Sequence, residues 1–351
     1  MKTNFHQVSS HRAVSLITAI FCLIHFPMPD AVAPVKSSVE PVVVKLPVGV
    51  NGGEIQTALD SLPTSGGEVV LPPGKVLIRQ SIVLRRDFQA LRGSGAATVL
   101  VLADDANCPV IIMGEPVNSP KSVLKNLSVS DLTIDGNRAH QQRELWQLAG
   151  EGSEIRNNGI TVQAVIDSVV KNVISAHCRS GGLVTTLGVR RLTVKNFESF
   201  DNEFDGLACY LTEDSLFTGL NLHNNPGAGI SLDLAFNHNV ISNALLNSND
   251  LGIFMRSSHE NRFYDVAIRG SRQHGVFMAN AEEYITGVAR PAPMTECTQN
   301  AFDNLVATDC GGAAFRVNDS TCTSNIVVRA TFDGNRHGNF SLAVPDLVML
   351  Q

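Results

Sequence analysis

Apolar and polar positions alternate in a short pattern that recurs between residues 158 and 280. Each copy has a glycine followed by a residue pair, in first and third place, that is apolar or small. This period of two places both side chains on one face of a strand. The glycines lie 23, 24, 23, 23 and 23 residues apart: Gly159, Gly182, Gly206, Gly229, Gly252 and Gly275. A fixed period of this size is typical of a solenoid with one copy per coil.

The pairs that follow the glycines are expected to point inward. They are Ile160/Val162, Leu183/Thr185, Leu207/Cys209, Ile230/Leu232, Ile253/Met255 and Val276/Met278. A second alternating run precedes each later glycine, at 170–174, 192–197, 216–222, 240–246 and 263–268. Turn-rich segments join the runs. The pattern predicts an all-β parallel β-helix with coils about 4.8 Å apart. The consensus of a leucine-rich repeat does not occur.

A helical pattern precedes the coils. Residues 51–62 predict a short amphipathic helix with one apolar side, formed by Ile55, Ala58, Leu59 and Leu62. The helix is followed by a Leu-Pro-Pro-Gly stretch ending at Gly74 and a Leu-x-Gly-x-Gly stretch ending at Gly95. The first coil of a solenoid has an open strand edge, so we expect the helix to cap that edge.

The first 33 residues predict a signal peptide. Lys2 and Arg12 precede an apolar run over 13–26, which is followed by Ala31-Val32-Ala33. The alternatives are an uncleaved anchor or cleavage at a neighbouring site, because Pro34 disfavours a cut after Ala33. We therefore expect a secreted or periplasmic protein, with no stable membrane span after signal removal. Residues 34–50 are expected as a linker and 51–351 as the β-helix domain.

The length and net charge of the chain limit the classes of function that it can have. A chain of 351 residues can form one elongated domain with a large core. The net charge of -6 and pI near 5.9 argue against a nucleic-acid partner, which usually requires a basic face. An anionic polysaccharide stays compatible with these values, because a local basic groove can exist on an acidic protein.

The chain resembles right-handed parallel β-helices of the pectin-lyase-like superfamily, through its predicted helix and the two glycine stretches after it. Residues 132–275 are similar to the catalytic modules of mannuronan C5-epimerases, through the Thr-Ile-Asp-Gly-Asn strand at 133–137 and the repeat at 201–206. The resemblance implies action on a uronate polymer. In that family an Asp-Pro-His-Glu element follows the glycine that corresponds to Gly182. Here this place reads Leu183-Val184-Thr185-Thr186.

The outward-facing positions form two columns. The fourth residues after the glycines include Tyr210, Asp233 and Arg256, which are expected to stack on successive coils. The second residues include Phe254 and Phe277. Tyr210 occupies the place where the resemblance implies a catalytic Asp.

Removal of the proton at C5 of a uronate requires that the adjacent carboxylate be neutralised, and Arg256 fits that role. Tyr210 with a neighbouring Asp, such as Asp233, can supply the base and the acid. Expulsion of the C4 oxygen would make a lyase, and return of the proton to the opposite face would make a C5-epimerase. Phe254 and Phe277 would then bind sugar rings.

A structural interpretation competes with this one. Asp233 and Arg256 can form an ordinary cross-strand ion pair covered by Tyr210. Phe254 and Phe277 can be buried under the insertion at 281–299. A non-catalytic β-helix that binds glycan or builds a surface structure is therefore the alternative function.

Two further residues are candidates for contact with an anionic chain. Trp146 lies in an insertion at 138–156 that interrupts the period, and insertions in a solenoid tend to gather on its binding face. Arg316 is expected to point outward in one of the last coils, where the register shifts. The alternative without a binding role is a solvent-exposed loop for Trp146 and a solvent-exposed side chain for Arg316.

No His, Asp or Cys spacing predicts zinc, so no cofactor is expected, with Ca²⁺ held by Asp and Asn side chains in turns as the alternative. Cys209 is expected in the core. Cys297, Cys310 and Cys322 cluster in sequence, and an exported protein can pair two of them. No second helix follows the last coil, so either residues 344–350 cover that end or another subunit does, giving an oligomer.

Overall fold

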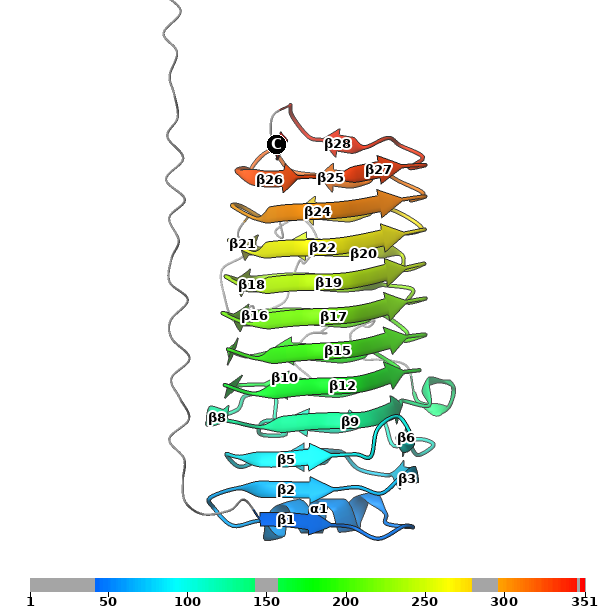
Figure 1. Cartoon of the computed structure of the whole chain (residues 1–351), viewed down its shortest axis with the longest axis vertical. Helices are drawn as coiled ribbons and strands as arrows, with labels where there is room; N and C mark the ends of the chain where they lie inside the picture. Colours follow the sequence, from blue (N-terminus) through cyan, green and yellow to red (C-terminus); the bar gives the residue numbers. More distant parts are fainter. Residues whose placement is uncertain (1–41, 143–156, 280–295, 346–347, 351) are drawn as a thin grey trace, which may run out of the picture. The chain divides into compact units, whose positions relative to one another are not determined.

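The computed structural model describes residues 42–142, 157–279, 296–345 and 348–350. All of the described strands belong to two parallel sheets, and the chain passes between these sheets within each coil. Figure 1 shows the strands stacked in sequence order from β1 at the blue end to β28 at the red end. None of the helices within these residues is long and apolar enough to cross a membrane.

The path of the first sheet is β1 (Val42–Lys45), β2 (Gly67–Val70), β5 (Gln89–Arg92), β9 (Ser128–Asp135), β12 (Val169–Ala176), β15 (Thr193–Phe200), β17 (Leu216–His223), β19 (Val240–Asn247), β22 (Arg262–Arg269), β24 (Ala301–Thr308), β26 (Asn325–Val328) and β29 (Val348–Leu350). The central strands of the first sheet, from β9 to β24 on its path, have eight residues each. Beside this path lie β3 (Gly74–Ile78), β6 (Thr98–Leu102) and β27 (Thr331–Asp333).

The second sheet carries the outward columns predicted above. Its path is β4 (Ile82–Leu84), β7 (Ile111–Met113), β10 (Ile160–Gln163), β13 (Leu183–Thr186), β16 (Leu207–Glu213), β18 (Ala228–Asn237), β20 (Leu251–Arg256), β23 (Val276–Ala279), β25 (Phe315–Val317) and β28 (Phe340–Leu342). Beside this path lie β8 (Leu124–Lys125), β11 (Val165–Ile166), β14 (Val189–Arg190) and β21 (Ser258–His259). A short 3₁₀ helix spans Arg138–His140.

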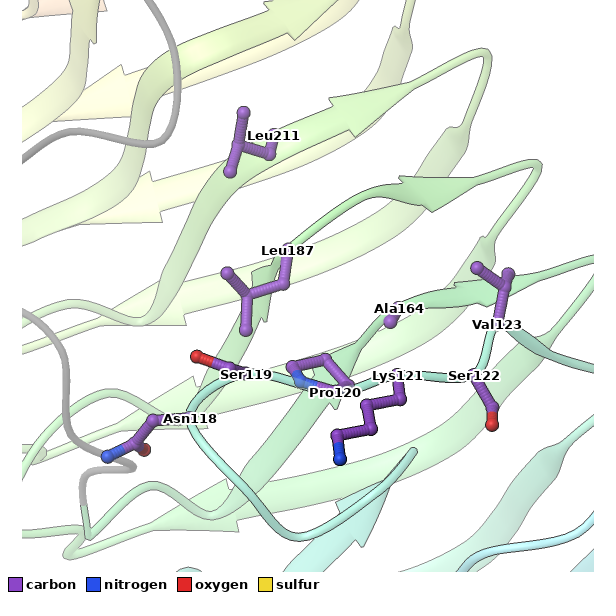
Figure 2. Close-up of a pocket in the computed structure, with 9 residues that line it drawn as sticks. All are labelled: Asn118, Ser119, Pro120, Lys121, Ser122, Val123, Ala164, Leu187 and Leu211. Carbon is purple, nitrogen blue, oxygen red and sulfur yellow. The ribbon is translucent and has the colours of Figure 1, made fainter.

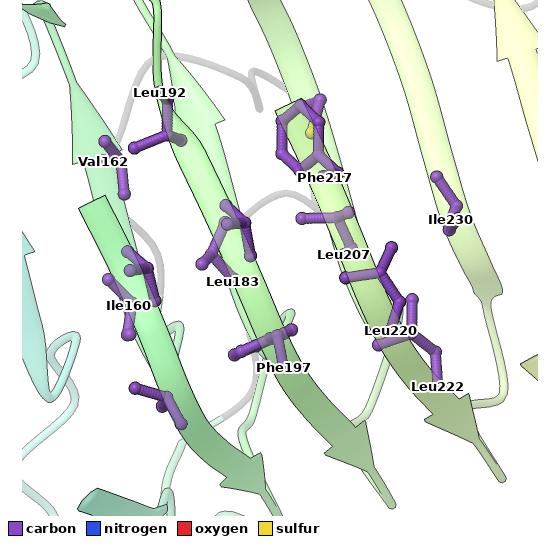
Figure 3. Packing of buried hydrophobic residues seen from close by; sticks show 14 of the residues in the cluster. Ile160, Val162, Leu183, Leu192, Phe197, Leu207, Phe217, Leu220, Leu222 and Ile230 are labelled. Carbon is purple, nitrogen blue, oxygen red and sulfur yellow. The ribbon is translucent and has the colours of Figure 1, made fainter. Parts of the chain in front are cut away.

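The predicted inward columns are confirmed. Ile160 pairs with Leu183, which pairs with Leu207, and the column continues through the later coils. All twelve predicted inward side chains are fully buried. Figure 3 shows the aliphatic residues of the second sheet beside Phe197, Phe217 and Leu222 of the first. The core is therefore a set of stacked columns, and the two-residue period is its cause.

Buried asparagine ladders hold the turns. In each ladder the side-chain carbonyl accepts the backbone N–H of the equivalent Asn in the preceding coil, at 3.0–3.2 Å. One ladder is Asn202, Asn225 and Asn249, and the other is Asn239, Asn261, Asn300 and Asn325. These amides satisfy polar backbone groups that the turns would otherwise leave unpaired in the interior.

The predicted helix is α1 (Gly52–Ser61), which buries Ile55, Ala58 and Leu59. Asn51 caps it, since its side chain accepts the N–H of Glu54 while the Glu54 carboxylate accepts the N–H of Asn51. The side chain of Arg86 donates to the carbonyls of Leu59, Asp60 and Leu62 at the helix C-terminus. The helix is thus tied to the first coil, and its capping of the edge stays a prediction.

Both ends of the described chain add strands to the first sheet. Val42–Lys45, expected as part of a linker, forms β1 and pairs with β2. Val50 is buried, and the valines at 42–44 favour a strand. The boundary between linker and domain stays a prediction. Val348–Leu350 pairs with β26 as a further strand rather than crossing the end. The expected signal peptide lies outside the described residues.

Candidate functional site

The outward face of the second sheet brings three predicted residues, Phe254, Phe277 and Arg316, into one row. Ser231 pairs with Phe254, Phe254 with Phe277, and Phe277 with Arg316. Arg316 therefore continues the predicted column directly, although the sequence suggested a shifted register there. The reason is that Ala314 takes the place of the coil's glycine, and Phe315 pairs with Val276.

The aromatic rings of this row stack on each other. Phe254 and Phe277 have centroids 5.6 Å apart and planes 11° apart. The guanidinium of Arg256 lies 4.9 Å from the Phe254 ring, and that of Arg316 lies 5.8 Å from the Phe277 ring. We call these four residues the Arg-Phe-Phe-Arg stack. Both rings are half-buried. Their faces contact one another and the cations. Their role as platforms for sugar rings stays a prediction.

The two arginines of the stack differ in charge environment. The Arg256 guanidinium forms an ion pair with Asp233, whose side chain is 1% exposed, while that of Arg256 is 14% exposed. The ion-pair alternative raised by the sequence is therefore present. Nε of Arg256 is buried and has no hydrogen-bond partner among the described residues.

Arg316 lacks a carboxylate partner within the described residues. Its Nη2 donates to the side-chain oxygen of Asn318 at 2.9 Å, and Asn318 donates in turn to Asp319 at 3.4 Å. A guanidinium held by a ring and an amide keeps its charge available to a ligand on the surface. Its side chain is half-buried, as is that of Arg256.

His274 extends this cluster and was not predicted as part of it. Its ring stacks on Phe277 at 5.6 Å, and its Nδ1 accepts the N–H of Ala313 at 2.9 Å. Burial lowers the pKa of His274, and the charges of Arg316 and His337 lower it further. The position directly before Gly275 carried no periodic signal, because such positions hold unlike residues in other coils.

Tyr210 lies opposite Asp233 in the register between β16 and β18, as predicted. It is half-buried. Tyr210, Asp233 and Arg256 therefore follow one another over three coils. Trp146, the remaining predicted contact, lies outside the described residues, as does most of the insertion at 281–299.

A shallow cavity of about 350 Å³ lies elsewhere, beside the loop 118–123 (Figure 2). Ala164, Leu187 and Leu211 line its other side from the corners of three coils, all with positive φ. Lys121 is the titratable residue of its lining. The cavity is apolar on the coil side and shares no residue with the predicted site.

No cluster of metal-ligating side chains supports a metal site within the described residues. Across the described ranges, no group of three or more His, Cys, Asp or Glu side chains is arranged to hold an ion. The expectation about Ca²⁺ stays untested.

Comparisons with known proteins agree on the fold. Residues 193–343 match the sequence model of a family described as right handed beta helix region. No curated protein matches the chain in sequence. The chain is a right-handed parallel β-helix, as its repeat predicts.

Three solved structures illustrate this likeness. The catalytic domain of a GH87 α-1,3-glucanase in complex with nigerose has a TM-score of 0.65 and 12% identity, over 89% of this chain and 58% of that one. The enzymatically active domain of bacteriophage CBA120 tailspike protein 2 has a TM-score of 0.63 and 13% identity, over 89% and 47%. The A-module of mannuronan C-5 epimerase AlgE6 from Azotobacter vinelandii has a TM-score of 0.50 and 16% identity, over 86% and 93%. At these identities the likeness concerns the fold alone.

Proposed function

We propose that this β-helix binds an anionic, uronate-containing polysaccharide on the outward face of its second sheet. The observation that carries the proposal is Arg316. It faces outward beside Phe277 and Asn318 with no carboxylate partner among the described residues, on a protein whose net charge is -6. A guanidinium presents paired donors that match a carboxylate, which is the charged group of a uronate.

The rest of the stack supports binding more strongly than catalysis. Asp233 is almost fully buried and already paired with Arg256, so neither charge is free to act alone on a substrate. The edges of two stacked phenyl rings lie between the arginines and add apolar contact area. Carbohydrate-binding is also consistent with neighbours of the same fold that include a glucanase bound to nigerose.

The direct test is binding of the purified protein to alginate, polygalacturonate and heparin, measured by titration calorimetry with and without Ca²⁺. Arg316→Ala is expected to weaken binding about 10- to 100-fold, because it removes a charge-assisted hydrogen bond. Arg262→Ala is the control, since it removes the same charge from an exposed position on the other sheet. Equal losses in both variants would show non-specific charge attraction and would contradict the proposed site.

A second candidate function is C5-proton abstraction, as a lyase or an epimerase. The observation in its favour is the Nε–H of Arg256, buried without a partner among the described residues and beside the Asp233–Tyr210 register pair. A uronate carboxylate placed there would be neutralised by Arg256, with Tyr210 as base or acid.

Ultraviolet absorbance of an unsaturated product and NMR of the polymer distinguish the reactions. Product that disappears in Tyr210→Phe, with binding retained, would establish catalysis. Binding without product on every polymer would leave the protein a glycan-binding scaffold.

We also propose that the protein acts after export, in the periplasm or outside the cell. The support is the charged, apolar and small-residue order of residues 1–33. Fractionation of cells that express the full chain, followed by N-terminal sequencing, tests it. Recovery of uncleaved protein from the cytoplasm would overturn it.

A further inference from the structure

Cys297 and Cys322 occupy equivalent positions in consecutive coils. Asn300 and Asn325, which are joined in the asparagine ladder, have the same separation in sequence as the two cysteines. The register pair Ala301 and Ile326 has this separation too. Equivalent Cα atoms of adjacent coils lie about 4.8 Å apart. A disulfide requires Cα atoms about 4.4–6.8 Å apart, so the coil spacing itself satisfies that requirement.

Direct contacts hold the two residues together. The backbone N–H of Cys297 donates to Sγ of Cys322 at 3.4 Å, and the Cys297 thiol donates to the carbonyl of Ala279 at 3.8 Å. The side-chain amide of Asn325 donates to the carbonyls of both, at 3.1 and 3.3 Å. Both side chains are fully buried. The asparagine ladder, through Asn325, therefore holds the two cysteines close to each other inside the folded protein.

The two thiols are chemically unequal. The hydrogen bond from Cys297 lowers the pKa of Cys322, whereas burial raises the pKa of Cys297. The sulfur with the lower pKa holds more thiolate and attacks first in thiol–disulfide exchange. Cys310 lies apart from both, because it follows the end of β24 whereas Cys297 precedes its start, and its thiol donates to the carbonyl of Thr308 at 3.6 Å. The geometry thus selects one pair from the three clustered cysteines.

We propose that Cys297 and Cys322 form a disulfide that cross-links two consecutive coils when the chain folds in the presence of a small-molecule disulfide such as oxidised glutathione. The Cys322 thiolate attacks one glutathione sulfur, and the first glutathione leaves as its thiolate. The Cys297 thiol then loses its proton and attacks Sγ of Cys322, and the second glutathione leaves. Two protein thiols are oxidised and one glutathione disulfide is reduced to two thiols, so electrons and atoms balance. This property is independent of polysaccharide binding.

Peptide mapping of the full-length protein tests the proposal. The reduced protein is incubated with oxidised glutathione during refolding, alkylated, and cleaved after Arg316 and Asp303, which separates the three clustered cysteines. We expect one joined pair containing Cys297 and Cys322, about 2 Da below the summed mass of its two reduced peptides. Reduction of this bond should lower the melting temperature by about 5 °C.

Variants give the control. Cys297→Ser and Cys322→Ser should each abolish the joined pair, while Cys310→Ser should retain it. Complete alkylation of both thiols after oxidation, mixed glutathione adducts only, or a bond between Cys310 and Cys322 would overturn the proposal. The mapping of the wild-type protein decides the matter even if a variant fails to fold.

Discussion

The carboxylate of Asp233 and the guanidinium of Arg256 form an ion pair between consecutive coils, with 1% of the Asp233 side chain exposed. Tyr210 lies next to Asp233 in the strand register, and the Phe254 ring packs against Arg256. The pair connects strands β18 and β20 on the outward face. Its burial makes it a structural element of the face as well as a candidate for chemistry.

Arg256→Ala is expected to destabilise the protein by about 3–5 kcal/mol, because it leaves the buried Asp233 carboxylate uncompensated. Urea denaturation measures the change. The exposed pair of Arg190 and Glu213, at 2.8 Å, is the control, and Arg190→Ala should cost less than about 1 kcal/mol. The double change of Asp233→Leu with Arg256→Met should recover most of the loss. Equal costs for Arg256→Ala and Arg190→Ala would show that the Asp233–Arg256 pair is solvated.

Each asparagine of the two ladders should stabilise the folded protein through its hydrogen bonds to buried backbone groups. Asn261→Ala removes the acceptor for the N–H of Asn239 and the donor to the carbonyl of Phe236. Two buried backbone groups lose their partners, so we expect a cost of at least about 2 kcal/mol in the free energy of unfolding.

The matched control for the ladder is Asn221→Ala, because Asn221 bonds the Glu198 carboxylate on a half-buried surface. Its cost should stay below about 1 kcal/mol. If the two variants unfold at the same urea concentration, the ladder is not a source of stability.

Phe277 should affect binding through Arg316. Phe277→Leu keeps an apolar side chain but removes the ring beneath the guanidinium, so polyuronate affinity should fall about 3- to 10-fold, less than for Arg316→Ala. Titration calorimetry at two salt concentrations measures both variants. The loss from Arg316→Ala should shrink at high salt, since screening weakens the charge interaction in the wild type. Unchanged affinity in Phe277→Leu would show that the ring does not orient Arg316.

His274 should make stability depend on pH. Its pKa is lowered from 6.5 in the folded protein, first by burial and then by the charge of Arg316. As pH falls, the unfolded chain binds the proton first, so the contribution of neutral His274 is complete above pH 6.5 and is lost as pH falls through the lowered value.

Unfolding free energies between about pH 7.5 and pH 5 measure this effect. His274→Gln can still accept the N–H of Ala313 but cannot be protonated, so its stability should fall less steeply on acidification. The lowered pKa of His259 persists in both proteins, which isolates His274 in the comparison. Parallel curves for the two proteins would rule out this titration.

The sequence by itself determined the fold and the inward columns. A glycine every 23 or 24 residues with a two-residue period after it leaves one arrangement for Ile160, Leu183 and Leu207, because successive side chains in a strand point to opposite faces. The same period placed Tyr210 opposite Asp233. The helix at 52–61 followed from its apolar side, whereas its Asn51 cap emerged from the structure.

Tertiary structure alone decided which contacts the outward-facing side chains make with one another. The period says that Phe254 and Phe277 face outward but not that their rings stack on each other and on arginines. It could not assign Arg316 to the row, because residues 280–314 separate it from β23 in sequence while the strands pair in space. The pairing of Arg256 with Asp233 depends on a contact between coils that a one-dimensional pattern does not contain.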